Sequence, residues 1–142
     1  MQPVLLDTSV YIAALRRGED GALAVRRLGS GSVVWLSGVV LEELYAGAGD
    51  RGQPVLERLE RDFDRAKRVL VPNLSDWTEA GRVLSHLASK YDYGQIGRGR
   101  LTNDALIAMS AERQGITVIT TNERDFRRLA EFRTFRWQVT TI

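Results

Sequence analysis

The sequence predicts an α/β protein of three layers, in which helices cover both faces of a central parallel sheet. Short apolar runs bounded by turn residues alternate along the chain with longer segments of helical periodicity. The runs are apolar throughout, which is typical of strands that are buried on both faces. Residues 101–114 are apolar nearly all round, as expected for a helix packed at the centre of such a protein.

The elements follow from this alternation and from local start and stop signals. We expect strands at residues 4–6, 33–36, 69–71, 118–119 and 135–139. We expect helices at residues 9–17, 19–28, 37–48, from Pro54 with an apolar face that reaches Leu70, from Ser75 or Asp76 to Tyr91, and at residues 101–114 and 122–129. Loops are expected at residues 47–52 and 94–99, where glycines gather.

Several single residues support these boundaries. Ser37 is a good N-cap, and Pro54 suits the first position of a helix. Gly115 is placed to end the central helix. In the helix before it, Trp77 is expected on the buried stripe, whereas His86 falls between the stripe positions and is expected at the surface.

Length and composition predict one soluble domain. The 142 residues, 44% apolar and 27% charged, suit a single domain covering residues 1–142. The longest uninterrupted apolar run covers only residues 10–15, and Asp7 interrupts the apolar start of the chain. We therefore expect neither a membrane span nor a signal peptide, and a cytoplasmic location.

The missing residue types restrict the chemistry. With no cysteine and one histidine, disulfides, thiolate catalysis and Cys- or His-rich metal sites are excluded, so catalysis must use carboxylates and hydroxyls. All but two of the 20 cationic residues are arginines, the exceptions being Lys67 and Lys90. Arginine suits phosphate recognition, although a genome rich in G and C would give the same bias.

Four acids stand where strands end or helices begin. Asp7 follows the first strand, Glu43 lies in a mostly apolar helix, Asp104 opens the central helix, and Asp125 follows the fourth strand. Each has an ordinary explanation, as an N-cap or through the helix dipole. Glu42 is the solvated neighbour, which leaves Glu43 as the glutamate that points inward.

Taken together, the four acids predict a cation site. Ligands of open parallel sheets bind outside the carboxyl ends of the strands, where these acids would gather. Their mutual repulsion would raise their pKa values and destabilise the fold unless a cation intervened. Mg²⁺ or Mn²⁺ prefers such oxygen ligands and can bind both a water and a phosphodiester oxygen. The predicted reaction is hydrolysis of a phosphodiester.

The same residues carry a family resemblance. Four blocks in the same order resemble those of PIN-domain ribonucleases, especially the VapC toxins of bacterial toxin–antitoxin pairs: residues 5–10 (LLDTSV), 41–47 (LEELYAG), 103–108 (NDALIA) and 118–126 (VITTNERDF). The resemblance covers nearly the whole chain and implies a PIN-like fold. The chain departs from the family pattern at Glu42, where a small or apolar residue is usual, and in the basic, glycine-rich residues 97–100.

The resemblance implies a role for each site residue. Asp7, Asp104 and Glu43 match the acids that bind Mg²⁺ or Mn²⁺, and Asp125 matches a less constant fourth catalytic acid. Thr8, Ser9 and Asn122 match supporting positions, and Asp125 and Asn122 are expected to orient the attacking water. The implied products carry a 5′-phosphate and a 3′-hydroxyl.

The resemblance also implies partners. RNA contacts are expected from arginines beside the third and fourth blocks: Arg98, Arg100, Arg124, Arg127 and Arg128. These arginines would otherwise serve ordinary solvation or pair with Glu123 and Glu131. The family further implies a homodimer and a cognate VapB-type antitoxin, whose chain inserts near the acidic site, with grooves between the early helices as its place.

Other functions fit less well. A haloacid-dehalogenase-like phosphatase needs a second aspartate where Ser9 stands, and no glycine-rich nucleotide motif follows a strand. The alternative that remains open is a PIN-like module that binds RNA or a partner without cutting it.

Overall fold

A five-stranded parallel sheet forms the centre of the molecule. The computed structural model describes residues 2–18, 21–92 and 95–141. The strands are β1 (Gln2–Leu6), β2 (Ser32–Ser37), β3 (Val69–Leu70), β4 (Thr117–Thr120) and β5 (Trp137–Val139). They lie in the order β3-β2-β1-β4-β5, and every neighbouring pair is parallel. The α/β class with a parallel sheet is therefore confirmed.

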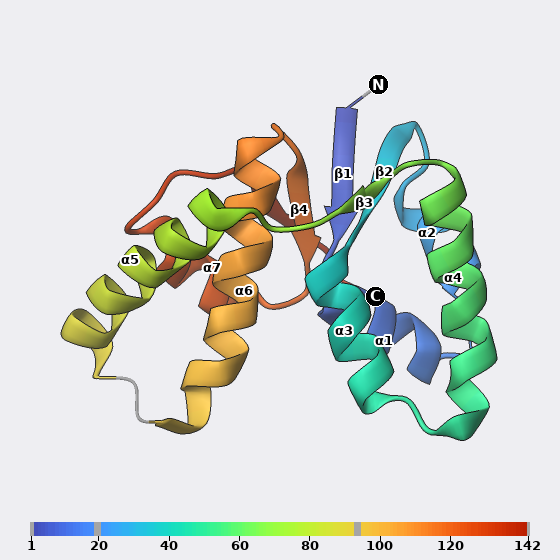
Figure 1. Cartoon of the computed structure of the whole chain (residues 1–142), viewed down its shortest axis with the longest axis horizontal. Helices are drawn as coiled ribbons and strands as arrows, with labels where there is room; N and C mark the ends of the chain where they lie inside the picture. Colours follow the sequence, from blue (N-terminus) through green and yellow to red (C-terminus); the bar gives the residue numbers. More distant parts are fainter. Residues whose placement is uncertain (1, 19–20, 93–94, 142) are drawn as a thin grey trace.

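Helices cover both faces of this sheet. They are α1 (Thr8–Arg16), α2 (Gly21–Leu28), α3 (Gly38–Gly47), the short 3₁₀ helix η1 (Asp50–Gly52), α4 (Gln53–Arg65), α5 (Leu74–Tyr91), α6 (Gln95–Arg113) and α7 (Glu123–Ala130). Figure 1 shows α1 to α4 on one side of the strands and α5 to α7 on the other, which gives the three layers expected. None of the helices in the described part of the chain is long and apolar enough to cross a membrane.

The strand order reverses between β1 and β4, so their carboxyl ends lie at a switch point of the topology. From β1 the chain moves outward through β2 to β3, and it then returns to the other side of β1 to form β4 and β5. The segments that leave β1 and β4 therefore diverge onto opposite faces, and this divergence is where ligands of open α/β sheets bind. Asp7 follows β1 directly, and Thr120 ends β4.

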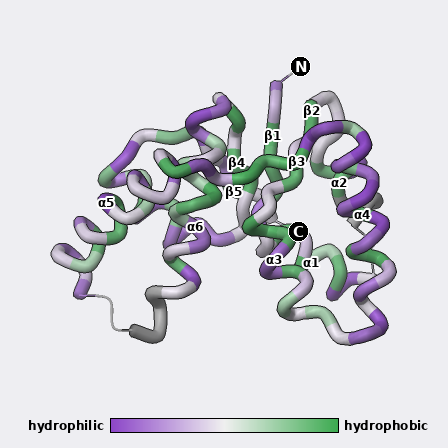
Figure 2. The backbone as a smooth tube through the Cα atoms, viewed as in Figure 1, coloured by the Kyte–Doolittle hydropathy of each residue, from purple (hydrophilic) through white to green (hydrophobic). Residues whose placement is uncertain are grey.

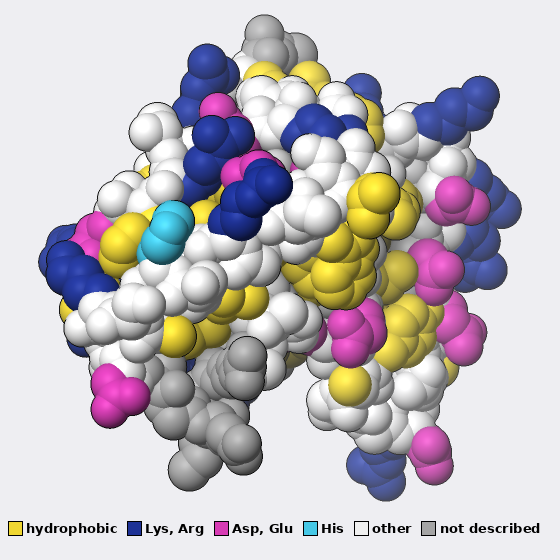
Figure 3. Space-filling view, turned by 60° about the vertical axis from the view of Figure 1, so that its left-hand side comes forward, with side chains coloured by type: hydrophobic (Ala, Val, Ile, Leu, Met, Phe, Trp, Pro, Cys, Tyr) yellow, Lys and Arg dark blue, Asp and Glu magenta, His cyan; other side chains and the backbone are white. Residues whose placement is uncertain are grey.

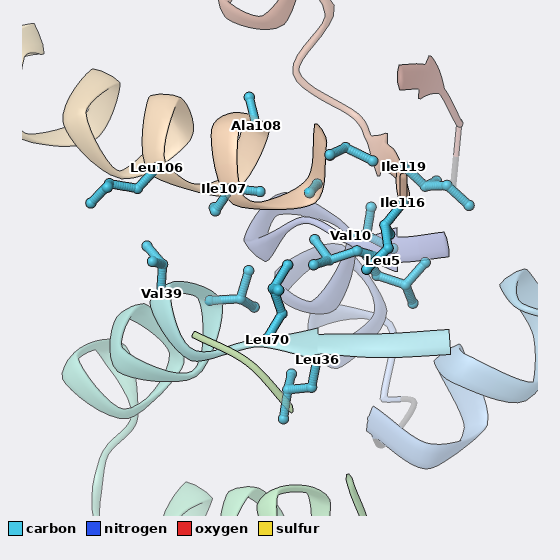
Figure 4. Close-up of a cluster of buried hydrophobic side chains, with 14 of the residues drawn as sticks. Leu5, Val10, Leu36, Val39, Leu70, Leu106, Ile107, Ala108, Ile116 and Ile119 are labelled. Carbon is cyan, nitrogen blue, oxygen red and sulfur yellow. The ribbon is translucent and has the colours of Figure 1, made fainter. Parts of the chain in front are cut away.

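The core consists of strand side chains packed between the two helix layers. Leu5 and Leu36 are fully buried, and they meet Val10 of α1 and Ile107 of α6 in one cluster. Figure 4 shows these side chains converging from the sheet and from both layers. In Figure 2 the strands are largely hydrophobic, while helices such as α4 carry hydrophilic residues along much of their length. Burial of apolar area on both faces of the sheet thus fixes the framework of the site.

One predicted loop is wrong, and the correction matters for the site. Residues 94–99 were expected to be a loop, but α6 begins at Gln95 and runs without interruption to Arg113. Gly94 lies outside the described residues. Because the helix begins earlier, Asp104 lies well inside α6 and not at its start. The packing of α6 against its neighbours overrides the low helix propensity of the glycines in this segment.

Two further boundaries differ from the prediction. Asn73, and neither Ser75 nor Asp76, is the N-cap of α5: its Oδ1 accepts from the Asp76 backbone N–H at 2.9 Å, and Asp76 Oδ2 accepts from the Asn73 N–H at 3.0 Å. This reciprocal pair is a capping box. The helix α4 ends at Arg65, and Leu70 belongs to β3 and does not extend the apolar face of α4.

The stripe of α5 that faces the core is also displaced from the prediction. The buried residues on this helix include Ala80, Val83 and Leu87, whereas the Trp77 side chain is 54% exposed. The buried stripe begins at Asp76, one residue before Trp77, so Trp77 lies off the stripe. His86 is exposed, as expected.

Candidate active site

Asp7 is buried at the N-cap position of α1, but its side chain makes no capping hydrogen bond. Its Oδ2 accepts from the hydroxyls of Ser9 and Thr120, each at 2.8 Å. Its Oδ1 is also buried, and no hydrogen-bond donor reaches it within the described residues. The ordinary explanation of Asp7 as a helix cap therefore fails, and one oxygen is left for a ligand.

Hydroxyl groups link the ends of β1 and β4 around Asp7. Thr120 is fully buried, and its Oγ1 accepts from the Asn122 N–H at 2.9 Å while donating to Asp7. Ser9 Oγ accepts from the Thr121 N–H at 3.1 Å. These bonds fix the orientation of the Asp7 carboxylate. Thr120 was missed from the sequence, although a hydroxyl residue that ends a buried strand at this edge was the available signal.

Glu43, and not Glu42, faces the site. Glu43 is half-buried in α3, and its Oε1 accepts from Thr8 Oγ1 at 2.7 Å, whereas Glu42 is exposed. Burial raises the pKa of Glu43, as does the negative charge of Asp7, and hydrogen bonds from Thr8 and Asn103 oppose the rise. Thr8 therefore holds Glu43 beside Asp7, since Thr8 and Asp7 are adjacent in the chain.

Asp104 is a buried acid in the interior of a helix. Only 5% of the residue is exposed, and its buried Oδ2 has no hydrogen-bond partner among residues 2–18, 21–92 and 95–141. The helix dipole does not explain an acid at this position, because its effect is confined to the first and last turns. Burial raises the pKa of Asp104 to about 8, and the charges of Asp7, Glu43 and Asp125 contribute in the same direction. The acids thus share one environment.

Asp125 differs from the other three acids. It is 2% exposed, and its Oδ2 accepts from Asn122 Nδ2 at 2.9 Å and from Arg100 Nη2 at 3.3 Å. Its Oδ1 accepts from Arg124 Nε at 3.2 Å. Burial alone would raise the pKa of Asp125, but the hydrogen bonds and the two arginine charges lower it. Asp125 is therefore held as a carboxylate by its neighbours.

The acids suit a cation that is bound directly by only one or two carboxylates and otherwise by water. In the described part of the chain no three acids or histidines are arranged so that all could hold one ion directly. Mg²⁺ commonly binds through one or two carboxylates and keeps several waters. Asp7 and Asp104 each offer a buried oxygen without a partner among the described residues, which suits such an ion, and burial also raises the pKa of Asp7.

The arginines expected to contact RNA lie near Asp125 or on α7. Arg100 and Arg124 bind Asp125, Arg127 pairs with Glu123, and the Arg128 guanidinium lies 4.6 Å from the ring centre of Tyr91. The side chain of Arg98 lies outside the described residues. A pocket of about 360 Å³ opens between α5 and α7 and is lined by Tyr91, Glu123, Arg124, Arg127, Arg128 and Glu131. On the face drawn in Figure 3, Lys and Arg side chains lie among acidic ones.

An apolar groove adjoins the acids. Its volume is about 570 Å³, and it is lined from α1, α3 and α4 by residues that include Ile12, Leu15, Val55 and Leu56 together with Glu43. Ile12 and Leu15 are exposed. Glu43 therefore borders both the acidic site and this groove.

Comparison with known proteins relates this architecture to one family. The model of the family described as "PIN domain" matches residues 4–132. The chain resembles the structure of DNA-bound VapBC from Salmonella typhimurium, with a TM-score of 0.68 and 23% identity over 98% of both chains. It also resembles FitAcB from Neisseria gonorrhoeae, with a TM-score of 0.65 and 24% identity over 97% of this chain and 96% of that one.

A third solved structure shows the same likeness. VapBC2 from Rickettsia felis, bound to a DNA fragment from the promoter, matches with a TM-score of 0.67 and 19% identity over 99% of this chain and 100% of that one. At these identities the likeness shows a common fold. No curated protein sequence matches the chain.

Proposed function

The chain belongs to the PIN-domain family, and from this premise we propose that it is a metal-dependent endoribonuclease that hydrolyses RNA phosphodiesters as the toxin of a VapBC-type toxin–antitoxin pair. The observation that carries the proposal is Asp104: a buried acid inside a helix, surrounded by other acids, with an oxygen that has no partner within the described residues. Such a group costs several kcal/mol unless it is protonated or bound to a cation.

Three acids are proposed to hold Mg²⁺ or Mn²⁺. Asp7 and Asp104 each offer an unpartnered buried oxygen, and Glu43 completes the set directly or through water. The chemistry that the ion supplies is a lower pKa for its bound water and compensation of negative charge on the scissile phosphate. Ser9 and Thr120 keep the Asp7 carboxylate in one orientation, and Thr8 does the same for Glu43.

The surroundings of the acids support the proposed partners. Arg98, Arg100, Arg124, Arg127 and Arg128 belong to α6 and α7, and they are proposed to contact the RNA backbone. The apolar groove beside Glu43 is proposed to receive the cognate VapB-type antitoxin. Two of the structures that share this fold are described as VapBC. A homodimer and a cytoplasmic location complete the proposal.

The decisive experiment combines cleavage with metal binding. The protein is incubated with single-stranded RNA and Mg²⁺ or Mn²⁺, the cut ends are analysed, and Mn²⁺ affinity is measured by calorimetry. We expect 5′-phosphate and 3′-hydroxyl ends, and we expect Asp104→Asn to reduce cleavage at least about 100-fold and to weaken Mn²⁺ binding. Asp64→Asn, an exposed acid on α4, is the matched control and should retain both properties. Unchanged cleavage and Mn²⁺ affinity in Asp104→Asn would refute the proposal.

One observation favours a second function. The side chains of Arg100 and Arg124 beside Asp125 are 64% and 66% exposed, which suits a PIN-like module that binds RNA or a partner without cutting it. That function predicts RNA binding with no metal-dependent cleavage by the purified protein. The same cleavage assay therefore separates the two functions.

A further inference from the structure

Asp125 is already neutralised by the protein. Both of its oxygens accept hydrogen bonds: Oδ2 from Asn122 and Arg100, and Oδ1 from Arg124. In contrast, Asp7 and Asp104 each keep a buried oxygen for which the described residues supply no donor. A divalent ion next to Asp125 would also lie next to two guanidinium cations, which disfavours it by direct repulsion.

Asp125 holds two arginines that are themselves largely exposed. Asp125 is 2% exposed, whereas the side chains of Arg100 and Arg124 are 64% and 66% exposed. They come from different helices, Arg100 from α6 and Arg124 from α7. A guanidinium has five N–H donors, and each arginine makes one hydrogen bond to Asp125, so Asp125 leaves most of the donors of these exposed side chains unused. Paired guanidinium groups with such donors suit the oxygens of a phosphate.

Arg124 also connects the acids to the pocket between α5 and α7. It lines this pocket together with Arg127 and Arg128 while it binds Asp125. Arg100 in turn contributes positive charge at Asp104. Basic groups therefore extend from the edge of the acidic site to the pocket, along a path that a nucleic-acid backbone can follow.

We propose that Asp125 is a positioning residue, not a metal ligand, and that it holds Arg100 and Arg124 as a clamp for the RNA phosphate next to the one that is cleaved. This inference rests on the proposed function and departs from the expectation that Asp125 orients the attacking water. It assigns the two parts of the site to different tasks: Asp7, Glu43 and Asp104 to the ion, and Asp125 with its arginines to the substrate.

The test separates RNA binding from metal binding. Affinity for a short labelled single-stranded RNA of mixed sequence is measured in EDTA, and Mn²⁺ affinity is measured without RNA. We expect Arg100→Ala, Arg124→Ala and Asp125→Asn each to weaken RNA binding about tenfold, whereas none of them should weaken Mn²⁺ binding more than about twofold. Arg82→Ala removes an exposed arginine that pairs with Glu79 within α5, and it should leave both affinities unchanged.

A double-mutant comparison tests the positioning role itself. If Asp125 acts through the arginines, Asp125→Asn should add no further loss of RNA affinity to a variant that already lacks Arg100 and Arg124. Arg124→Lys should recover part of the loss, because the charge returns without the planar fork. Should Asp125→Asn fail to fold, the two arginine variants carry the test: they must lose RNA affinity and keep Mn²⁺ affinity.

Two results would overturn the inference. In one, Asp125→Asn weakens Mn²⁺ binding as much as Asp104→Asn does. In the other, RNA affinity in EDTA is the same for the arginine variants and the wild type. Neither result touches the proposed ribonuclease function, which fails if the wild type shows no metal-dependent cleavage or if Asp104→Asn leaves metal binding and cleavage unchanged.

Discussion

At the scale of single residues, the four acids of the site differ in the direction of their pKa shifts. Burial raises the pKa of Asp7, Glu43 and Asp104, and the charges of neighbouring acids add to the effect at Glu43 and Asp104. The Asp125 side chain is also buried, yet its arginine and asparagine neighbours keep it charged. The direction of each pKa shift is therefore decided by the hydrogen-bond donors around the carboxylate and not by the type of residue.

The raised pKa of Asp104 predicts how stability depends on pH. The folded protein keeps the Asp104 proton up to about pH 8, whereas the unfolded chain, with a pKa near 3.8, releases it far earlier. Between these values the unfolded state binds fewer protons, so the free energy of unfolding falls as the pH rises. Asp104→Asn removes this penalty, and in EDTA above pH 8 we expect it to exceed the wild type by on the order of a few kcal/mol.

Urea denaturation in EDTA across this pH range measures the difference. Asp104→Asn and the wild type should have similar stability near pH 4 and separate as the pH rises. The exposed Asp64→Asn should follow the wild type throughout. Parallel curves for Asp104→Asn and the wild type at every pH would show that Asp104 does not carry the penalty.

At the scale of elements, the early start of α6 can be checked with a single glycine. Gly99 lies inside α6, its φ is not positive, and a Cβ added there meets open space. Because alanine favours a helix interior over glycine, Gly99→Ala should raise the free energy of unfolding by about 0.5–1 kcal/mol. Thermal or urea denaturation measures the change.

Gly115 provides the opposite case for comparison. Its φ is +68°, a conformation that side chains with a Cβ adopt with strain. Gly115→Ala should therefore destabilise the protein by about 1 kcal/mol or more. A Gly99→Ala variant that is no more stable than the wild type would contradict a continuous helix through residues 95–99.

An ion pair between the buried Asp76 and the exposed Arg113 joins the start of α5 to the end of α6. Arg113 Nε donates to both carboxylate oxygens of the buried Asp76, at 3.1 and 2.9 Å, and its Nη2 donates to the Val71 carbonyl at 3.2 Å. Arg113→Ala would leave the buried Asp76 without these charge-assisted hydrogen bonds, so we expect a loss of about 1.5–3 kcal/mol in the free energy of unfolding.

Two comparisons make that prediction specific. Arg82→Ala breaks an exposed pair with Glu79 and should change stability by less than about 1 kcal/mol. Adding Asp76→Asn to Arg113→Ala should recover part of the loss, because the unpaired charge is then removed. Equal effects of Arg113→Ala and Arg82→Ala in urea denaturation would exclude a special role for the pair of Arg113 with Asp76.

These elements also show what the sequence could predict. The apolar runs predicted all five strands, and Ser37 predicted the start of α3 through its cap, where its hydroxyl accepts from the Val39 N–H. The interior position of Asp104 could not be predicted, because glycines made residues 94–99 look like a loop. Helix propensity is a local quantity, whereas packing on neighbouring helices decided the boundary.

At the scale of the whole molecule, the order of the strands brings distant segments to one edge. Periodicity predicted parallel strands, but it carries no information on which strand lies beside which. Once β4 lies beside β1, Thr120 reaches Asp7 across 113 positions of sequence. The sequence could therefore predict the site residues that stand at the ends of strands and helices. It could not predict the hydrogen bonds that join one segment to another.

Because the acids come from separate parts of the chain, an ion that binds them should stabilise the entire fold. A ligand at about 100 times its Kd adds about 2.7 kcal/mol, which for a domain of this size corresponds to roughly 5–10 °C in Tm. We expect this rise for the wild type when saturating Mg²⁺ or Mn²⁺ replaces EDTA in a thermal melt. The rise should be larger at pH 8 than at pH 6, because a proton on Asp104 competes with the ion.

Variants of the acids test whether the rise in Tm on adding the ion comes from binding at this site. Asp7→Asn and Asp104→Asn should each lose most of the rise in Tm, since each removes a carboxylate whose buried oxygen no described residue satisfies. Asp64→Asn keeps the four acids and should rise like the wild type. If Asp7→Asn and Asp104→Asn gain as much as the wild type on adding Mn²⁺, the ion binds elsewhere. The convergence of the acids would then serve some purpose other than holding a metal.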